Sequence, residues 1–148
     1  MKIYIGADHN GFGVKQEISN FLQRAGYTVE DVGNTKLHPD DDFPEYASMV
    51  ATTLLADGDP ASRGILICGS GQGMCIAANR FKGIRASLCW NLEEARASRN
   101  DDDSNVLCLT SRYLNMVDTK SIVMTWLNTP FAGAPRFTRR IQQLDNLG

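Results

Sequence analysis

The chain has 148 residues, which suits one compact domain with a hydrophobic core of its own. Its formal net charge of −2, from 15 basic and 17 acidic residues, argues against binding to nucleic acid or to a membrane surface, for which a basic face is expected. The chain has no apolar stretch long enough to span a bilayer and no basic-then-apolar signal segment, so we expect a cytoplasmic protein.

Apolar runs that fit strands alternate with segments of helical periodicity from the first residues onward. We expect five strands, at residues 2–7, 28–32, 63–68, 84–89 and 105–109. A first helix follows the first strand and is closed by Gly26, and a second begins near Pro44 and ends at the turn that starts with Asp57. A short helix follows the glycine-rich turn after residue 68, and further helices are expected at residues 92–99, 114–127 and 137–147.

This alternation of strands and helices with short connections predicts a parallel sheet that is covered on both faces. Right-handed crossovers make it a doubly wound, Rossmann-like α/β fold, and we expect residues 1–148 to form a single domain. In such sheets, ligands bind beyond the carboxyl ends of the strands. The loops expected to meet there begin at Asp8, Cys68, Trp90 and Thr110.

The cysteines argue against a zinc site and for a reducing compartment. No two of them have Cys-x-x-Cys spacing, and only His9 and His38 are available as histidine ligands. Cys89 and Cys108 lie in apolar runs, so we expect them to be buried thiols in a reducing cytosol.

The turn that follows the third strand has glycine at three alternate positions. These are Gly69, Gly71 and Gly73. The turn is not a dinucleotide fingerprint, because Met74 stands where the third glycine of that motif would fall, and it lacks the lysine of a phosphate-binding loop. A nucleotide-binding module is therefore a distant alternative. The turn could be merely tight, but the adjacent Cys68 thiol and Ser70 hydroxyl favour a cluster of N–H donors for an anion or a developing oxyanion.

Cys68 is open to two interpretations. Cysteine is commonly a small buried apolar residue. Cys68, however, ends a strand just before a helix start, where the local field favours a thiolate. No histidine lies near it in the sequence, so we favour a proton-transfer base over a covalent nucleophile.

Other polar residues near the expected loops have two interpretations, one purely structural and one functional. Asp8 and His9 follow the first strand and either belong to a solvated loop, in which Asn10 caps the next helix, or contact a sugar oxygen and an anion. The arginines that could join His9 in a phosphate clamp are Arg112, Arg136 and Arg140. The acidic runs at residues 40–42 and 101–103 could bind a hard cation, but we interpret them as solvated loop carboxylates.

Together these motifs resemble those of the ribose-5-phosphate isomerase type B family and of its relatives, the galactose-6-phosphate isomerase subunits. They follow the family's order through almost the whole chain. The matching segments are residues 8–9, 42–47, 67–73, 76–80, 83–86, 105–107 and 111–112, with the pair Arg136 and Arg140. The resemblance implies an aldose–ketose isomerase that acts on a sugar phosphate without a metal or another cofactor, by default on ribose 5-phosphate and ribulose 5-phosphate.

The resemblance also implies a role for each candidate residue. In the family, a base at the Cys68 position moves a proton from C2 to C1 through an enediolate, and the turn, which also contains Ser70, stabilises the oxyanion. That turn comprises Gly69, Ser70, Gly71, Gln72 and Gly73. Asp8 contacts the sugar, and the implied phosphate ligands are His9, Arg112, Arg136 and Arg140. The site is shared across the interface of a homodimer, which can pair further into a tetramer.

The sequence departs from the family where the substrate is expected. Asp101 and Asp102 stand where members usually carry a His-Asn pair, whose histidine donates a proton to open the sugar ring. An aspartate is normally ionised at pH 7 and is a poor donor unless its pKa is raised. Phe43 replaces a frequent tyrosine, and Phe137 replaces a usual histidine.

Three explanations of the Asp101 departure remain open. The substrate could need no ring opening, as for a tetrose 4-phosphate, or it could be another sugar phosphate such as galactose 6-phosphate. Asp101 and Asp102 could share a proton, which would let one of them act as the donor. The enzyme could also rely on spontaneous ring opening. A different class of function, a non-catalytic sugar-phosphate-binding subunit, fits the missing histidine but not the retained Cys68.

Overall fold

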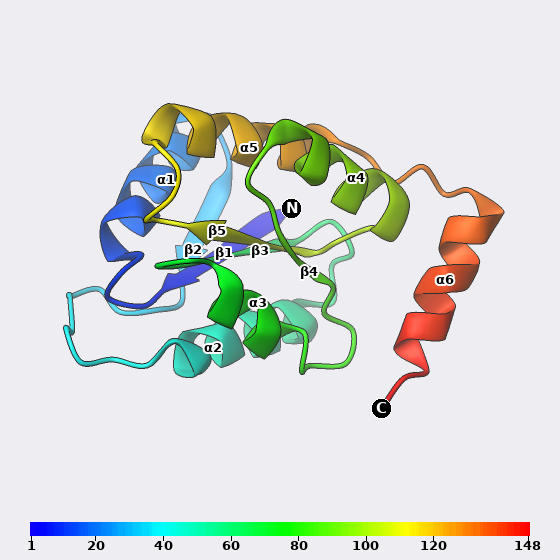
Figure 1. Ribbon diagram of the computed structural model, residues 1–148, viewed down its shortest axis with the longest axis horizontal. Coiled ribbons are helices and arrows are strands. Elements are labelled where there is room, and N and C mark those ends of the chain that lie inside the picture. The colour runs from blue at the N-terminus through cyan, green and yellow to red at the C-terminus, as the bar shows by residue number, and fades with distance from the viewer.

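The computed structural model describes residues 1–148 as one sheet of five parallel strands with six helices (Figure 1). The strands are β1 (Lys2–Ala7), β2 (Thr28–Asp31), β3 (Arg63–Cys68), β4 (Ala86–Leu88) and β5 (Val106–Thr110). The helices are α1 (Phe12–Arg24), α2 (Phe43–Asp57), α3 (Gln72–Ala78), α4 (Leu92–Asp102), α5 (Met116–Asn128) and α6 (Pro135–Asp145). The strand order is β2-β1-β3-β5-β4, which confirms the doubly wound parallel fold.

Apolar side chains point to both faces of the sheet because both faces are covered. Ile65 and Ile67 of β3 face a core formed with α1, α4 and α5, whereas Leu66 between them faces α2 and α3. The first core includes the fully buried Trp126, whose indole N–H donates to Ser104 Oγ at 2.8 Å. The helices cover the middle of the sheet on both faces. The turns at the carboxyl and amino ends of the strands, called its two edges below, remain available for a functional site.

Most element boundaries lie within two residues of expectation, and the differences that matter for the site concern β4, α4 and one helix cap. β4 is confined to Ala86–Leu88, and α4 continues three residues beyond the predicted end, so that Asp101 and Asp102 belong to its last turn. The helix ends at Asp103, whose φ of 48° is left-handed. The prediction that Asn10 caps α1 is wrong, because Gly11 occupies the cap position without a side-chain bond.

The last helix lies outside both layers. Figure 1 shows α6 to one side of the molecule, beyond α4, with which it makes its main helix contact. None of its residues is buried, although Phe137, Ile141 and Leu144 recur at helical spacing along it. Helix α6 is therefore an amphipathic arm whose apolar face the chain itself covers only in part. No helix of the protein is both long and apolar enough to cross a membrane.

Candidate active site

Backbone hydrogen bonds join the turns at the carboxyl ends of β1, β3 and β5. The Asp8 N–H donates to the carbonyl of Ile67 at 3.3 Å, and the Arg112 N–H donates to the carbonyl of Gly69 at 3.1 Å. The same Gly69 carbonyl accepts a bond of 2.7 Å from the hydroxyl of Thr110. These bonds bring Asp8, Arg112 and the glycine turn together at the edge where the topology predicts a ligand.

Each glycine of the turn is required by a different neighbour. Gly71 has a φ of +80°, and a Cβ there would lie 2.5 Å from Leu88 Cδ1 and 3.1 Å from the backbone of Leu109. A Cβ on Gly73 would lie 2.7 Å from the ring of Phe43, and one on Gly69 would lie 3.0 Å from an Arg112 guanidinium nitrogen. The turn is therefore pressed between α2, β4 and β5, and the Arg112 guanidinium rests against it.

The thiol of Cys68 lies within this turn. Cys68 is 5% exposed, and its sulfur accepts a hydrogen bond of 3.2 Å from the Gly71 N–H. The N–H groups of Gly73 and Met74, in the first turn of α3, have no acceptor within the chain. Ser70 Oγ accepts from the N–H of Gln72 at 3.2 Å, so its own proton remains available. The turn therefore offers a sulfur that can accept a proton and, beside it, donors for a negatively charged oxygen.

Asp8 is a buried carboxylate at the end of β1, not a solvated loop residue. It is 5% exposed, and its Oδ1 accepts from the N–H groups of Asn10 and Gly11 at 3.0 and 3.1 Å. Burial raises the pKa of Asp8, and these hydrogen bonds oppose the rise. Asp8 thus supplies the acceptor that a helix cap would otherwise provide, and its second oxygen makes no hydrogen bond within the chain.

The interpretation of residues 40–42 as solvated carboxylates is wrong for Asp41. Its side chain is 8% exposed, and its Oδ1 accepts from both the backbone N–H of His9, at 2.9 Å, and the ring Nδ1, at 2.8 Å. Burial opposes ionisation of Asp41, but the hydrogen bonds from His9 outweigh it and lower its pKa. In turn, the bond to Asp41 raises the pKa of His9. The sequence has three consecutive aspartates here, and nothing in it indicates which of them is buried.

The remaining predicted site residues form a second group at the opposite edge of the sheet. Helix α4 starts after the carboxyl end of β4 and runs back, so Asp101 and Asp102 lie beside the segments that precede β4 and β5. Burial and then the charge of Asp101 raise the pKa of Asp102, and the nearby positive charge of Arg140 opposes this. Arg140 and Arg136 are exposed on α6. Within one chain, these residues do not join the Cys68 turn.

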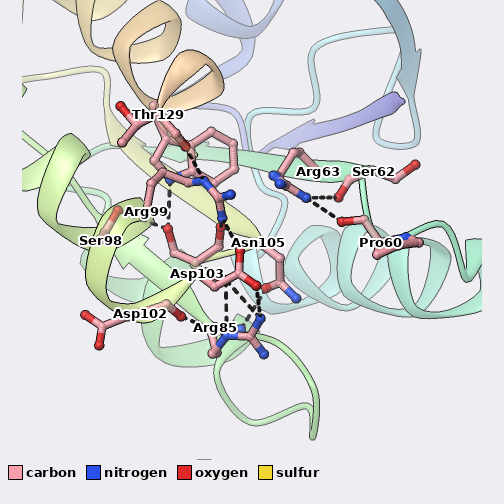
Figure 2. A network of polar contacts seen from close by, with 12 residues as sticks. Pro60, Ser62, Arg63, Arg85, Ser98, Arg99, Asp102, Asp103, Asn105 and Thr129 are labelled. Atoms are coloured by element: carbon pink, nitrogen blue, oxygen red, sulfur yellow. Dashed lines mark hydrogen bonds and ion pairs between the residues drawn. The ribbon is translucent and has the colours of Figure 1, made fainter. Parts of the chain in front are cut away.

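A buried arginine holds this second group in place (Figure 2). Arg99, 4% exposed, donates to Asp103 Oδ1 at 2.8 Å and to the carbonyl of Thr129 at 3.2 Å. Arg85 donates to the carbonyls of Asp102 and Asp103 at 3.0 and 2.9 Å. The end of α4 is thus tied to the segment that leads into α6. Neither Arg99 nor Arg85 was predicted, because both depend on backbone carbonyls that only the fold brings near, Thr129 for Arg99 and Asp102 and Asp103 for Arg85.

Comparison with known proteins identifies the family of the chain. A family model described as Ribose/Galactose Isomerase matches residues 3–144. The probable ribose-5-phosphate isomerase B of Mycoplasma pneumoniae is 42% identical over 142 residues, which cover 96% of this chain and 91% of that protein. A crystal structure of a ribose 5-phosphate isomerase from Thermotoga maritima matches with a TM-score of 0.92 at 40% identity, over 99% of this chain and 98% of that one.

A second solved structure, ribose-5-phosphate isomerase B from Mycoplasma genitalium with bound ribulose-5-phosphate, also gives a TM-score of 0.92, at 38% identity over 97% of this chain and 93% of that one. The chain belongs to the ribose/galactose isomerase family. The resemblance deduced from the motifs is confirmed.

We predict that Gly71→Ala destabilises the protein by about 2–4 kcal/mol, because it adds both a left-handed alanine and a steric overlap. Gly13→Ala is the matched control, since a Cβ there meets nothing within 4 Å, and its effect should stay within about 1 kcal/mol. Urea unfolding of the two variants measures both effects. Equal midpoints for Gly71→Ala and the wild type would contradict the steric argument.

We also predict that Cys75 is the most readily alkylated thiol of the folded protein outside the Cys68 turn. A hydrogen bond with Cys108 lowers the pKa of Cys75 to about 7, whereas burial raises the pKa of Cys89. Iodoacetamide labelling followed by peptide mass spectrometry should show Cys75 modification rising through pH 7 while Cys89 stays unmodified. Faster labelling of Cys89 than of Cys75 would show that this interpretation is wrong.

Proposed function

We propose that this chain interconverts ribose 5-phosphate and ribulose 5-phosphate in the cytoplasm. The observation that carries the proposal is the Cys68 thiol, which lies in a glycine turn with free N–H donors beside it. The relatives support the substrate, since one of them was solved with bound ribulose-5-phosphate. The four free cysteines support a reducing compartment.

Cys68 acts as the base. Its thiolate takes the proton from C2 of the open-chain aldose, and the electron pair of that bond moves toward the C1 carbonyl oxygen. N–H groups of the turn, which includes Gly73, stabilise the negative oxygen of the enediolate. The thiol then returns the proton to C1, and O2 becomes the carbonyl as its proton passes to O1. The Ser70 hydroxyl, whose proton is uncommitted, lies in the same turn and serves the two substrate oxygens.

The phosphate lies between two subunits of a homodimer. His9 and Arg112 approach it from the edge that carries Cys68, while Arg136 and Arg140 reach it from α6 of a second copy, together with Asp101 and Asp102. Two observations support this assembly. One chain holds the two groups at opposite edges of its sheet, and α6 has an apolar face that the chain leaves partly uncovered.

Asp101 and Asp102 carry out ring opening as a coupled pair. A carboxyl that is protonated at neutral pH can donate to the ring oxygen, and the raised pKa of Asp102 is in the required direction. Assays with four-, five- and six-carbon sugar phosphates decide the substrate. Turnover of a tetrose 4-phosphate alone would mean that no ring opening takes place, and no turnover of any of them would contradict the isomerase proposal.

Replacing Cys68 by alanine should lower kcat by roughly 10²–10⁴-fold, the range expected for loss of a general base, with little change in KM. The control is Cys75→Ala, which removes the neighbouring thiol and should keep wild-type kcat. The coupled assay of ribulose 5-phosphate formation measures both. Wild-type kcat in Cys68→Ala would exclude Cys68 as the base.

The shared site predicts complementation between two inactive variants. Cys68→Ala and Arg140→Ala homodimers should both be inactive at low substrate concentration. Heterodimers purified after co-expression with two different tags should regain activity, because one of their two sites contains neither substitution. Inactive heterodimers would place the whole site within one chain, and sedimentation of the wild type would distinguish a dimer from a tetramer.

A further inference from the structure

A polar contact outside the Cys68 turn joins two loops at the carboxyl edge of the sheet. His9 donates its backbone N–H, at 2.9 Å, to the same Asp41 oxygen that its ring Nδ1 contacts at 2.8 Å. The two side chains differ in exposure, since that of His9 is 33% exposed and that of Asp41 only 8%. The carboxylate therefore backs the imidazole from the protein side, and the outer part of the ring faces solvent.

Asp41 is itself held from behind. The side-chain amide of Asn34 lies 3.5 Å from Asp41 Oδ2 and also contacts the hydroxyl of the buried Tyr46 on α2. The carbonyl of Asn34 accepts a bond of 2.5 Å from Lys15 Nζ. The Lys15 side chain is 1% exposed and is neutralised by Asp31 at 2.8 Å. The segment that carries Asp41 is thus anchored to α1 and α2.

This arrangement determines which nitrogen of His9 can meet a ligand. Nδ1 is occupied by Asp41, and Nε2 makes no hydrogen bond within the chain. The next residue, Asn10, places its side-chain amide near Gly69, beside the Arg112 guanidinium, for which no ion pair exists within the chain. One uncommitted ring nitrogen and one unpaired guanidinium therefore flank the same turn.

We propose that Asp41 is a positioning residue, which fixes the His9 ring with Nε2 outward and keeps it positively charged so that it binds the phosphate dianion of the substrate. The inference rests on the proposed function of this site. It adds that phosphate recognition depends on a carboxylate that does not touch the phosphate.

Because His9 gains or loses a proton with pH, the proposed role of Asp41 predicts that phosphate binding depends on pH. The hydrogen bond to Asp41 is the main cause that raises the pKa of His9, the charges of Asp8 and Asp41 add to it, and burial opposes it. Without the Asp41 charge, the pKa falls toward the ordinary value of 6.5, so the positive charge is lost at lower pH. The KM values of the wild type and of Asp41→Asn should then differ above pH 6.5 and hardly at all at low pH, where both rings are protonated.

The test compares Asp41→Asn with Asp40→Asn, which makes the same charge change at an exposed neighbour without side-chain hydrogen bonds. We expect Asp41→Asn to raise KM for ribose 5-phosphate roughly tenfold at pH 7.5, with nearly unchanged kcat and recovery toward pH 5.5. Asp41→Ala also frees the ring, so its KM should remain raised at pH 5.5. Asp40→Asn should behave as the wild type. A KM of Asp41→Asn equal to that of Asp40→Asn, or a rise that is the same at every pH, would overturn the inference.

NMR titration of the histidine rings provides a readout that needs no turnover. A His38→Gln background leaves His9 as the only histidine. The midpoint of His9 should fall in Asp41→Asn and stay constant in Asp40→Asn, and equal midpoints would overturn the inference. If the wild type isomerised no sugar phosphate, inorganic phosphate would serve as the probe. Weaker phosphate binding at His9 in Asp41→Asn alone would support the role of Asp41, and equal binding would overturn it.

Discussion

The close approach of backbones around the turn after β3 is the constraint on which the site depends. Gly71 adopts a left-handed conformation against the backbone of Leu109, and the carbonyl of Gly69 is bound by the residues that follow β5. A Cβ has no room at Gly71, and one at Gly69 would displace the Arg112 guanidinium. As a result, the sulfur of Cys68 and the N–H groups of the turn are oriented by the sheet itself, and little reorganisation is needed when a negative charge develops beside them.

Within one chain, the same fold places the charged candidate residues in two separate groups. His9 and Arg112 lie at the carboxyl edge, whereas Asp101, Asp102 and the α6 arginines lie at the other edge. There, the buried Arg99 joins the end of α4 to Thr129, which precedes α6. The proposed base and the four proposed phosphate ligands cannot all meet within one chain of this shape. Dimerisation through the partly uncovered face of α6 would bury apolar side chains and complete the site in one step. Assembly and activity would then depend on each other.

The strands and helices could be predicted because the core residues follow a local period. The position of Cys68 within the glycine turn could also be predicted, because its neighbours in space are its neighbours in sequence. Its role as a base stays a prediction. Asp41 could not be predicted in this way. It stands in a run of three aspartates, and only the tertiary position of His9 distinguishes it from Asp40. The prediction that α4 ends near residue 99 failed for a similar reason. Arg85 donates to the carbonyls of Asp102 and Asp103, and Arg99 pairs with the Asp103 carboxylate. These contacts stabilise the end of that helix and outweigh the poor helix propensity of consecutive aspartates.

The resemblance to isomerases could be established from motifs alone, since they extend along nearly the whole chain. What replaces the ring-opening histidine could not, because the answer depends on what Asp101 and Asp102 face in the assembled protein. Burial and the charge of Asp101 raise the pKa of Asp102, and the positive charge of Arg140 opposes that rise.

A crystal structure of the protein with bound ribulose 5-phosphate tests the central claim most directly. The account predicts the sugar phosphate between two subunits, with Cys68 Sγ of one within about 3.5 Å of C1 and C2. The phosphate should be bound by His9 and Arg112 from that subunit and by Arg136 and Arg140 from the other. A sugar phosphate bound entirely by one chain, or one whose C1 and C2 lie far from the sulfur, would contradict it.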